Sequence, residues 1–179
     1  MSAHKFYGPK GVGALYVRNG IEFERIQDGG HQEKGKRSGT ENVAGIVGLA
    51  EALKLANKNI EQNNKKILEL RSYFISKLEE NMKDIKINGD LKKRLPGNIN
   101  ITFKGMDSLE LLLKLDEYGI CASAGSACST GESSPSHVLT AIGLTPEDAF
   151  STLRFSLGKE NTINDIDKTI EVLKSCMNM

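Results

Sequence analysis

The segment SAHKFYGPKGVG, residues 2–13, decides how the rest of the chain is interpreted. Lys5 stands beside His4 and close to Ser2, and the residues that follow are rich in glycine. A lysine whose surroundings lower its pKa can form a Schiff base with an aldehyde, and a hydroxyl and an imidazole can bind a phosphate. Glycine lets the backbone come close to such a ligand. A solvated surface lysine is the plainer alternative, and the missing G-K-[ST] ending excludes the pattern of a P-loop.

A second polar segment precedes the first long helical pattern. Residues 28–42 are almost wholly polar or glycine and end in RSGTEN, after which apolar residues recur with helical spacing from Val43. Loops of this length are usually functional or disordered. Thr40 and its neighbours can simply cap the helix, or their hydroxyl and backbone N–H groups can bind an anion at its N-terminus. The sequence leaves both interpretations open.

The third segment holds Cys128. It lies in ASAGSACSTGESSP, residues 122–135, among small residues, whereas a structural cysteine is usually buried among apolar neighbours. We therefore expect an exposed, reactive thiol on a loop. Cys121 and Cys176 fall in a predicted strand and a predicted helix, and we expect both to be inert. Three cysteines at these spacings form neither a disulfide framework nor a zinc or CxxC pair, so no metal site is predicted.

Arg154 lies between Leu153 and Phe155 in a predicted strand, where an unpaired guanidinium is costly. An internal ion pair is one explanation, and bidentate capture of a substrate carboxylate is the other. His137 follows Cys128 along the chain, and we expect it to be an ordinary helix residue rather than a base for that thiol.

Hydrophobic spacing predicts strands and helices along most of the chain. Residues 11–17 and 21–26 have the pattern of a hairpin, and a helical pattern from Val43 is either one long helix or two helices kinked near 62–64. In the last helix, four side chains are expected to face inward: Ile163, Ile166, Ile170 and Leu173. The other predicted strands are 85–88, 98–103, 120–123 and 151–157, and the other predicted helices begin near 107, 145 and 162.

These elements predict an α/β chain in two unequal parts. Residues 43–179 have the pattern of a complete unit in which helices pack on a small sheet. Residues 1–42 contain only a hairpin and polar loops, and an isolated hairpin is marginally stable in water. We therefore interpret the first part as a piece of something larger.

Composition excludes several classes of protein. Of the 179 residues 39% are hydrophobic and 26% are charged, which suits a globular core. The net charge of +1 gives no field that points to nucleic acid or a membrane surface. No stretch approaches the ~20 apolar residues of a membrane span. The cysteine content favours a reducing, cytoplasmic setting.

Taken together, the segments resemble the cysteine desulfurases of the NifS/IscS type, class-V aminotransferase-like enzymes that use pyridoxal 5'-phosphate (PLP). The similar motifs occur in the family's order over essentially the whole chain: SAHKFYGPKGVGALYVR, GGHQEKGKRSGTENVAGIVGLAEAL, LPGNINITF, SAGSACSTGESSPSHVLTAIGL and LRFSLG. The resemblance implies a fold type I transferase. Residues 1–42 would be a remnant of the large PLP-binding domain with its lysine motif, hairpin and phosphate loop, and residues 43–179 the small C-terminal domain with the catalytic cysteine loop.

The resemblance also implies the cofactor site. Lys5 would bind PLP covalently, and Ser2 and His4 would bind its phosphate. Thr40 would reach the phosphate of a neighbouring subunit, which implies a homodimer. The acid that pairs with the pyridine nitrogen and the histidine that stacks on the ring lie upstream of the lysine in the family, so neither can be assigned here.

For the substrate, the resemblance implies that Arg154 holds the carboxylate of L-cysteine and that Cys128 is the nucleophile. The products would be L-alanine and a Cys128 persulfide, whose sulfur passes to an iron–sulfur scaffold or another acceptor protein. Because part of the family's site is missing, we expect the isolated chain to be inactive. A selenocysteine lyase and a non-catalytic module that binds sulfur-acceptor proteins remain alternatives, as does a cysteine hydrolase, for which no ordered histidine partner is evident.

Overall fold

The computed structural model describes residues 1–124 and 134–177. The chain divides into two compact units, Met1–Ile60 and Glu61–Met179, and each is described here by itself. The sequence predicted that the complete α/β unit begins at Val43, whereas the compact unit begins at Glu61. The assignment of residues 1–42 and 43–179 to two functional domains stays a prediction.

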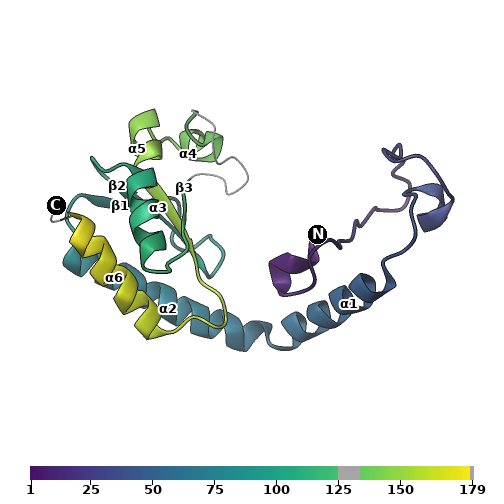
Figure 1. Cartoon of the computed structure of the whole chain (residues 1–179), viewed down its shortest axis with the longest axis horizontal. Coiled ribbons are helices and arrows are strands. Elements are labelled where there is room, and N and C mark those ends of the chain that lie inside the picture. The colour runs from purple at the N-terminus through teal and green to yellow at the C-terminus, as the bar shows by residue number, and fades with distance from the viewer. Residues whose placement is uncertain (125–133, 178–179) are drawn as a thin grey trace. The chain divides into compact units, whose positions relative to one another are not determined.

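The second unit is built on a four-stranded antiparallel sheet (Figure 1). Its strands are β1 (Ile85–Ile87), β2 (Asn98–Phe103), β3 (Ser123–Ala124) and β4 (Thr152–Ser156), and their spatial order is β1-β2-β4-β3. The strands predicted around 85, 98 and 151 are confirmed. The strand predicted at 120–123 is shorter and begins only at Ser123, so Cys121 precedes it.

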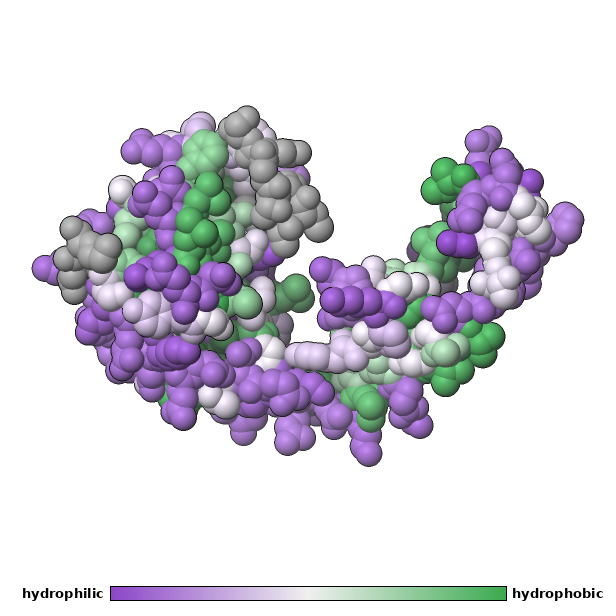
Figure 2. All heavy atoms as spheres, in the orientation of Figure 1, coloured by the Kyte–Doolittle hydropathy of each residue, from purple (hydrophilic) through white to green (hydrophobic). Residues whose placement is uncertain are grey.

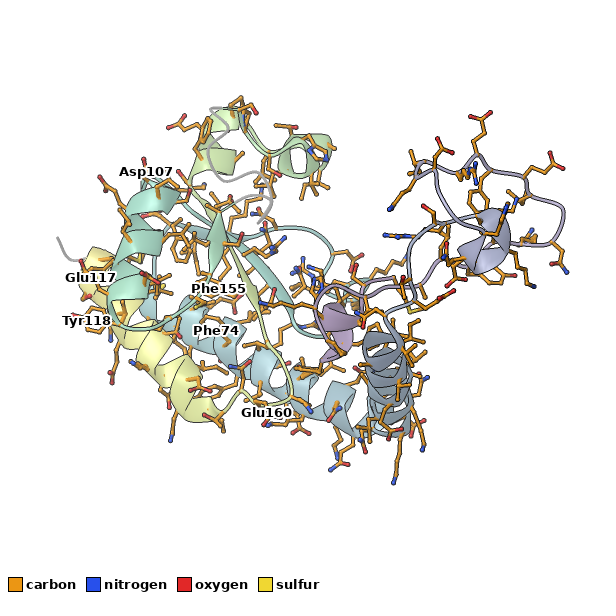
Figure 3. The ribbon with its side chains drawn as sticks, turned by 45° about the vertical axis from the view of Figure 1, so that its right-hand side comes forward. Phe74, Asp107, Glu117, Tyr118, Phe155 and Glu160 are labelled. Carbon is orange, nitrogen blue, oxygen red and sulfur yellow. The ribbon has the colours of Figure 1, made fainter. Side chains whose placement is uncertain are left out.

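One face of the sheet is covered by the helices α2 (Ile60–Asn81), α3 (Ser108–Glu117) and α6 (Ile163–Met177). The rings of Phe74 and Phe155 meet edge to face at 5.2 Å in this core (Figure 3). The buried side chains of the core alternate along the strands and follow the inner helix faces: Leu70, Phe74, Leu78, Met82, Ile99, Ile101, Phe103, Leu111, Leu115, Leu153, Phe155, Ile166, Ile170, Val172 and Leu173.

Local capping explains where these helices begin. Asp107 accepts a hydrogen bond from Leu109 N at 2.7 Å at the start of α3. At the start of α6, Asp165 accepts the backbone N–H of Thr162 at 2.8 Å, and this bond holds the pKa of the Asp165 carboxyl below its ordinary value. The predicted inward position of Ile163 is wrong: as the first residue of α6 it is 51% exposed, because it precedes the turn that packs on the sheet.

Two short helices complete the second unit. They are α4 (His137–Ala141) and α5 (Pro146–Phe150), and Thr145 caps α5 by accepting Asp148 N at 3.1 Å. A small separate core joins them through Leu139, Leu144 and Ala149. His137 is the exposed first residue of α4, in agreement with its prediction as an ordinary helix residue.

The first unit contains α1 (Val43–Lys58) and two short 3-10 turns, η1 (Ala3–Phe6) and η2 (Gln32–Gly35). α1 ends at Lys58 with Asn59 as its C-cap, so two helices form rather than one, and the break comes before the predicted kink. None of the described helices combines the length and the apolar character that a membrane span needs.

The predicted hairpin at 11–26 is not formed. Residues 14–26 contain no strand, and the isolated bridge between Ser2 and Gly13 is the pairing described in this part of the chain. Leu15 and Tyr16 are 75% and 83% exposed, and Ile26 is fully exposed. Figure 2 shows hydrophobic residues on the surface of this unit. A two-stranded ribbon needs an apolar surface to pack against, and these side chains pack against none, because they remain exposed.

Candidate active site

Lys5 lies in a closed loop, which we call the lysine loop (residues 1–14). The loop is closed at its base by backbone hydrogen bonds from Ala3 N to Val12 O (3.0 Å) and from Ala14 N to Met1 O (2.9 Å). Inside it, η1 carries Lys5, whose N–H bonds Ser2 O at 3.1 Å. The loop therefore fixes the backbone of the lysine although its side chain is exposed.

Small residues let the lysine loop pack closely on α1. Ala3 is completely buried. A Cβ at Gly8 would lie 2.9 Å from the Cβ of Ala3 and 3.2 Å from that of Ala52, and a Cβ at Gly48 would lie 2.7 Å from Pro9 Cγ. Larger residues at these positions would push the loop off the helix. The glycines thus hold the lysine against a helix, a role that the sequence analysis did not assign to Gly48.

We predict that Gly13→Ala opens the lysine loop. Its added Cβ would lie 2.6 Å from Met1 O, closer than real Cβ contacts allow, so the backbone bonds at the base of the loop must break. The amides of Ala3 and Ala14 are then expected to lose most of their protection against hydrogen exchange. Val12→Ala, which adds no atom, is the matched control. Unchanged protection in Gly13→Ala would contradict the described geometry.

The side chains of the lysine loop are available for a ligand. Ser2, His4 and Lys5 are all exposed, and within the described part of the chain their side chains make no hydrogen bond or ion pair. They offer a hydroxyl, an imidazole and an amine from one short turn. The structure thus brings together three of the predicted cofactor residues on η1 and its flank.

The loop that precedes α1 is held by a residue that the sequence analysis missed. Ser38 is buried, and its hydroxyl lies within hydrogen-bonding distance of the carbonyl oxygens of Gln27 (3.1 Å) and Asp28 (2.9 Å). In the sequence Ser38 is only a serine between a charged residue and a glycine, and this pattern is too common to identify it as important. Asn42 caps α1 by accepting Gly45 N at 3.0 Å. Thr40 is exposed beside this cap, and its hydroxyl has no partner among the described residues.

Arg154 lies at the middle of β4, on the sheet face opposite the main core. Its neighbours along the strand, Leu153 and Phe155, point into that core. Arg154 as a whole residue is half-buried, and no acidic side chain among the described residues pairs with it. The sequence left two explanations open, and the first of them, an internal ion pair, is absent from the described part of the chain. A half-buried arginine in this setting favours an anionic ligand.

The three cysteines lie in different segments of the second unit. Cys128, the predicted nucleophile, lies outside the described residues. Cys121 is exposed ahead of β3, and Cys176 is half-buried in α6, where its thiol donates to Val172 O at 3.3 Å. Lys5 and Thr40 belong to the first unit and Arg154 to the second, so each is described within its own unit.

A short, closed backbone loop that exposes a lysine amine beside a hydroxyl and an imidazole suits the binding of PLP. Residues 1–169 match the family described as aminotransferase class-V, so the chain belongs to this family. Among curated relatives, the cysteine desulfurase IscS of Clostridium botulinum is 51% identical over 175 residues, which are 97% of this chain and 44% of that protein. The cysteine desulfurase of a Nostoc species is 48% identical over 173 residues, 97% of this chain and 43% of that protein.

Solved structures agree with the fold. A NifS-like protein matches with a TM-score of 0.87 at 35% identity, over 99% of this chain and 45% of that one. The NifS-like protein of Rickettsia africae matches with a TM-score of 0.79 at 34% identity, over 89% of this chain and 41% of that one. The expected fold class, a fragment of a fold type I PLP enzyme with helices on a small sheet, is confirmed. The chain spans less than half the length of these relatives.

The residues of the lysine loop fit two ends of PLP, the cofactor of this family. The Lys5 amine suits the aldehyde, and the hydroxyl of Ser2 and the imidazole of His4 suit the phosphate. The segment 2–13 contains no aspartate or glutamate that could pair with the pyridine nitrogen. The donor set therefore fits the aldehyde and phosphate ends and leaves the ring nitrogen without a partner from this loop.

Proposed function

We propose that this chain carries the lysine, cysteine and arginine of a PLP-dependent cysteine desulfurase that takes sulfur from L-cysteine. The observation that supports this most is Arg154, a half-buried arginine without an acidic partner among the described residues, in a chain that is 51% identical over 175 residues to part of a protein named cysteine desulfurase IscS. An α-amino acid substrate carries the carboxylate that such a guanidinium binds in bidentate fashion.

In this proposal each residue has one task. PLP, when bound, supplies an electron sink for bonds at the substrate Cα. Ser2 and His4 bind its phosphate, and Lys5 binds its aldehyde and, once released, moves protons at the substrate carbon. Thr40 binds the phosphate held by a second copy of the chain, so the active form is a homodimer. Arg154 orients the substrate through its carboxylate.

Cys128 performs the transfer. Its thiolate attacks the sulfur of L-cysteine, an S–S bond forms and the C–S bond of the substrate breaks. L-Cysteine and the Cys128 thiol thereby become L-alanine and the Cys128 persulfide, with no atom gained or lost. The outer sulfur then passes to an acceptor protein of iron–sulfur cluster assembly, and we place this exchange in the cytoplasm, where thiols stay reduced.

A second candidate function is a non-catalytic module that binds sulfur-acceptor proteins. It is favoured by the exposed apolar side chains of the first unit, among them Leu15, Tyr16 and Ile26. Apolar side chains in water favour association with a partner. On this view the 179-residue chain by itself turns over no cysteine.

The proposal is tested by a chimera in which this chain replaces the matched 44% of the Clostridium botulinum protein. We expect the chimera with PLP to form L-alanine from L-cysteine, and both the chain alone and the Lys5→Ala chimera to form none. A folded, PLP-loaded chimera without turnover would refute the desulfurase proposal. Robust formation of L-alanine by the chain alone would show that the reaction needs no further residues. A reaction that is faster with selenocysteine than with L-cysteine would favour a selenocysteine lyase.

A further inference from the structure

A row of polar residues crosses the whole sheet on the face that carries Arg154. Asn88 N bonds Asn100 O at 2.9 Å beyond the end of β1, Asn100 lies opposite Arg154 across β2 and β4, and Ser123 of β3 lies opposite Arg154 on its other side. The order of the row is therefore Asn88, Asn100, Arg154 and Ser123. The last three are half-buried, whereas Asn88 is only 2% exposed.

Asn100 and Arg154 form the kind of cross-strand pair whose side chains approach most closely. Leu157 N bonds Gly97 O and Phe103 N bonds Ser151 O, so the hydrogen-bonded pairs of β2 and β4 fall on the core-facing residues. Asn100 and Arg154 are then a non-hydrogen-bonded pair, in which opposite Cα atoms are ~4.5 Å apart. The next non-hydrogen-bonded pair on this face is Thr102 and Thr152. Their side chains do come close, since their hydroxyl oxygens are 2.8 Å apart.

The direction of the hydrogen bonds along this row determines which way the side-chain amide of Asn100 is turned. Thr152 donates to the Asp148 carbonyl (2.6 Å), which can only accept, so Thr152 must accept from Thr102. Thr102 in turn accepts from Asn88 Nδ2 at 2.8 Å.

The same Asn88 nitrogen lies 2.9 Å from Asn100, which must therefore present its oxygen to Asn88. The Nδ2 hydrogens of Asn100 are left on the side away from Asn88, and no described residue accepts them.

Stability alone does not account for this row. The Oδ1 atom of Asn88 is buried without a donor in the described part of the chain, which is a cost that folded proteins rarely accept. The Nδ2 group of Asn88 donates one hydrogen bond to Asn100 and one to Thr102, and so holds the Asn100 side chain in one orientation beside Arg154. An unsatisfied buried polar atom in a folded protein calls for an explanation, and the fixed orientation of Asn100 beside Arg154 provides one.

We infer that Asn100 is a substrate-binding residue whose Nδ2–H donates to the carboxylate that Arg154 binds. The inference rests on the proposed function, because it takes the anion at Arg154 to be the α-carboxylate of an amino acid. Arg154 and Asn100, which lie on neighbouring strands, then both donate hydrogen bonds to one carboxylate. The buried residues Asn88, Thr102 and Thr152 keep the Asn100 amide in place. Asn88 is accordingly a positioning residue.

The test follows the side-chain N–H signals of the ¹⁵N-labelled full chain by NMR during titration with L-alanine. We expect the Nε–H signal of Arg154 and the Nδ2–H₂ signals of Asn100 to shift together with one Kd. Asn100→Ala should raise that Kd about tenfold, as loss of a hydrogen bond to a charged group does, and Asn100→Asp should raise it further by placing a negative charge beside the carboxylate.

Asn98→Ala is the matched control, because Asn98 lies on the same strand and the same face and donates no described side-chain bond. Its Kd should stay unchanged, and backbone spectra report whether each variant is folded. A shift at Arg154 with none at Asn100, or an unchanged Kd in folded Asn100→Ala or Asn100→Asp, overturns the inference and leaves the proposed role of Arg154. No shift at Arg154 overturns that role and the inference with it.

Discussion

Replacing Phe74 with alanine is expected to lower the free energy of unfolding of the Glu61–Met179 unit by about 3–5 kcal/mol. The ring is 2% exposed and meets Phe155 edge to face at 5.2 Å with an interplanar angle of 77°. Its removal leaves a cavity between α2 and β4 and removes an aromatic pair as well as buried area. Urea denaturation followed by circular dichroism measures the loss.

Two further variants make this expectation specific. Ser72→Ala, on the exposed side of the same helix, should change the free energy of unfolding by less than about 0.5 kcal/mol. In a double-mutant cycle, Phe74→Ala and Phe155→Ala should couple by about 0.5–1.5 kcal/mol. A loss below about 1 kcal/mol in Phe74→Ala would mean that the two rings do not form the centre of this core.

Replacing Arg154 with alanine in the Clostridium botulinum chimera is expected to raise KM for L-cysteine about 10- to 100-fold. A hydrogen bond between charged groups contributes roughly 1.5–3 kcal/mol, and alanine removes the whole donor fork. Arg154→Lys should recover only part of the loss, since an ammonium cannot bind a carboxylate in bidentate fashion. Steady-state kinetics of alanine formation measures both variants.

The matched control removes the same charge elsewhere. Lys86 is an exposed residue of β1 that lies opposite Thr102, and Lys86→Ala should leave KM unchanged. A similar rise in KM for both variants would indicate a general electrostatic effect. An unchanged KM in Arg154→Ala would exclude this guanidinium from substrate binding.

Local signals predicted the second unit well. The alternation of Ile99, Ile101 and Phe103 set the inner face of β2, and Thr145 followed by Pro146 marked the start of α5. Such signals act over a few residues and do not need the rest of the fold. The candidate residues Ser2, His4 and Lys5 could also be found this way, because their unusual density in one segment is visible without a structure.

Non-local features could not be predicted. The segments at 11–17 and 21–26 have strand-like sequences, but a strand also needs a paired neighbour, and the one pairing described there is the isolated bridge between Gly13 and Ser2. Ser38 binds carbonyls that lie eleven and ten residues away, and Asn88 meets Asn100 only through strand register. Pattern reasoning sees periodicity along the chain, whereas these contacts depend on which residues the topology brings together.

Mass spectrometry of the Cys128-containing peptide, after the chimera has reacted with L-cysteine, decides most directly whether sulfur passes to this chain. The expected result is one added sulfur atom on Cys128 but not on Cys121 or Cys176, formed in step with L-alanine and absent in the Lys5→Ala chimera. Alanine formation at an undiminished rate in Cys128→Ser, or turnover that leaves Cys128 a plain thiol, would contradict the proposed reaction.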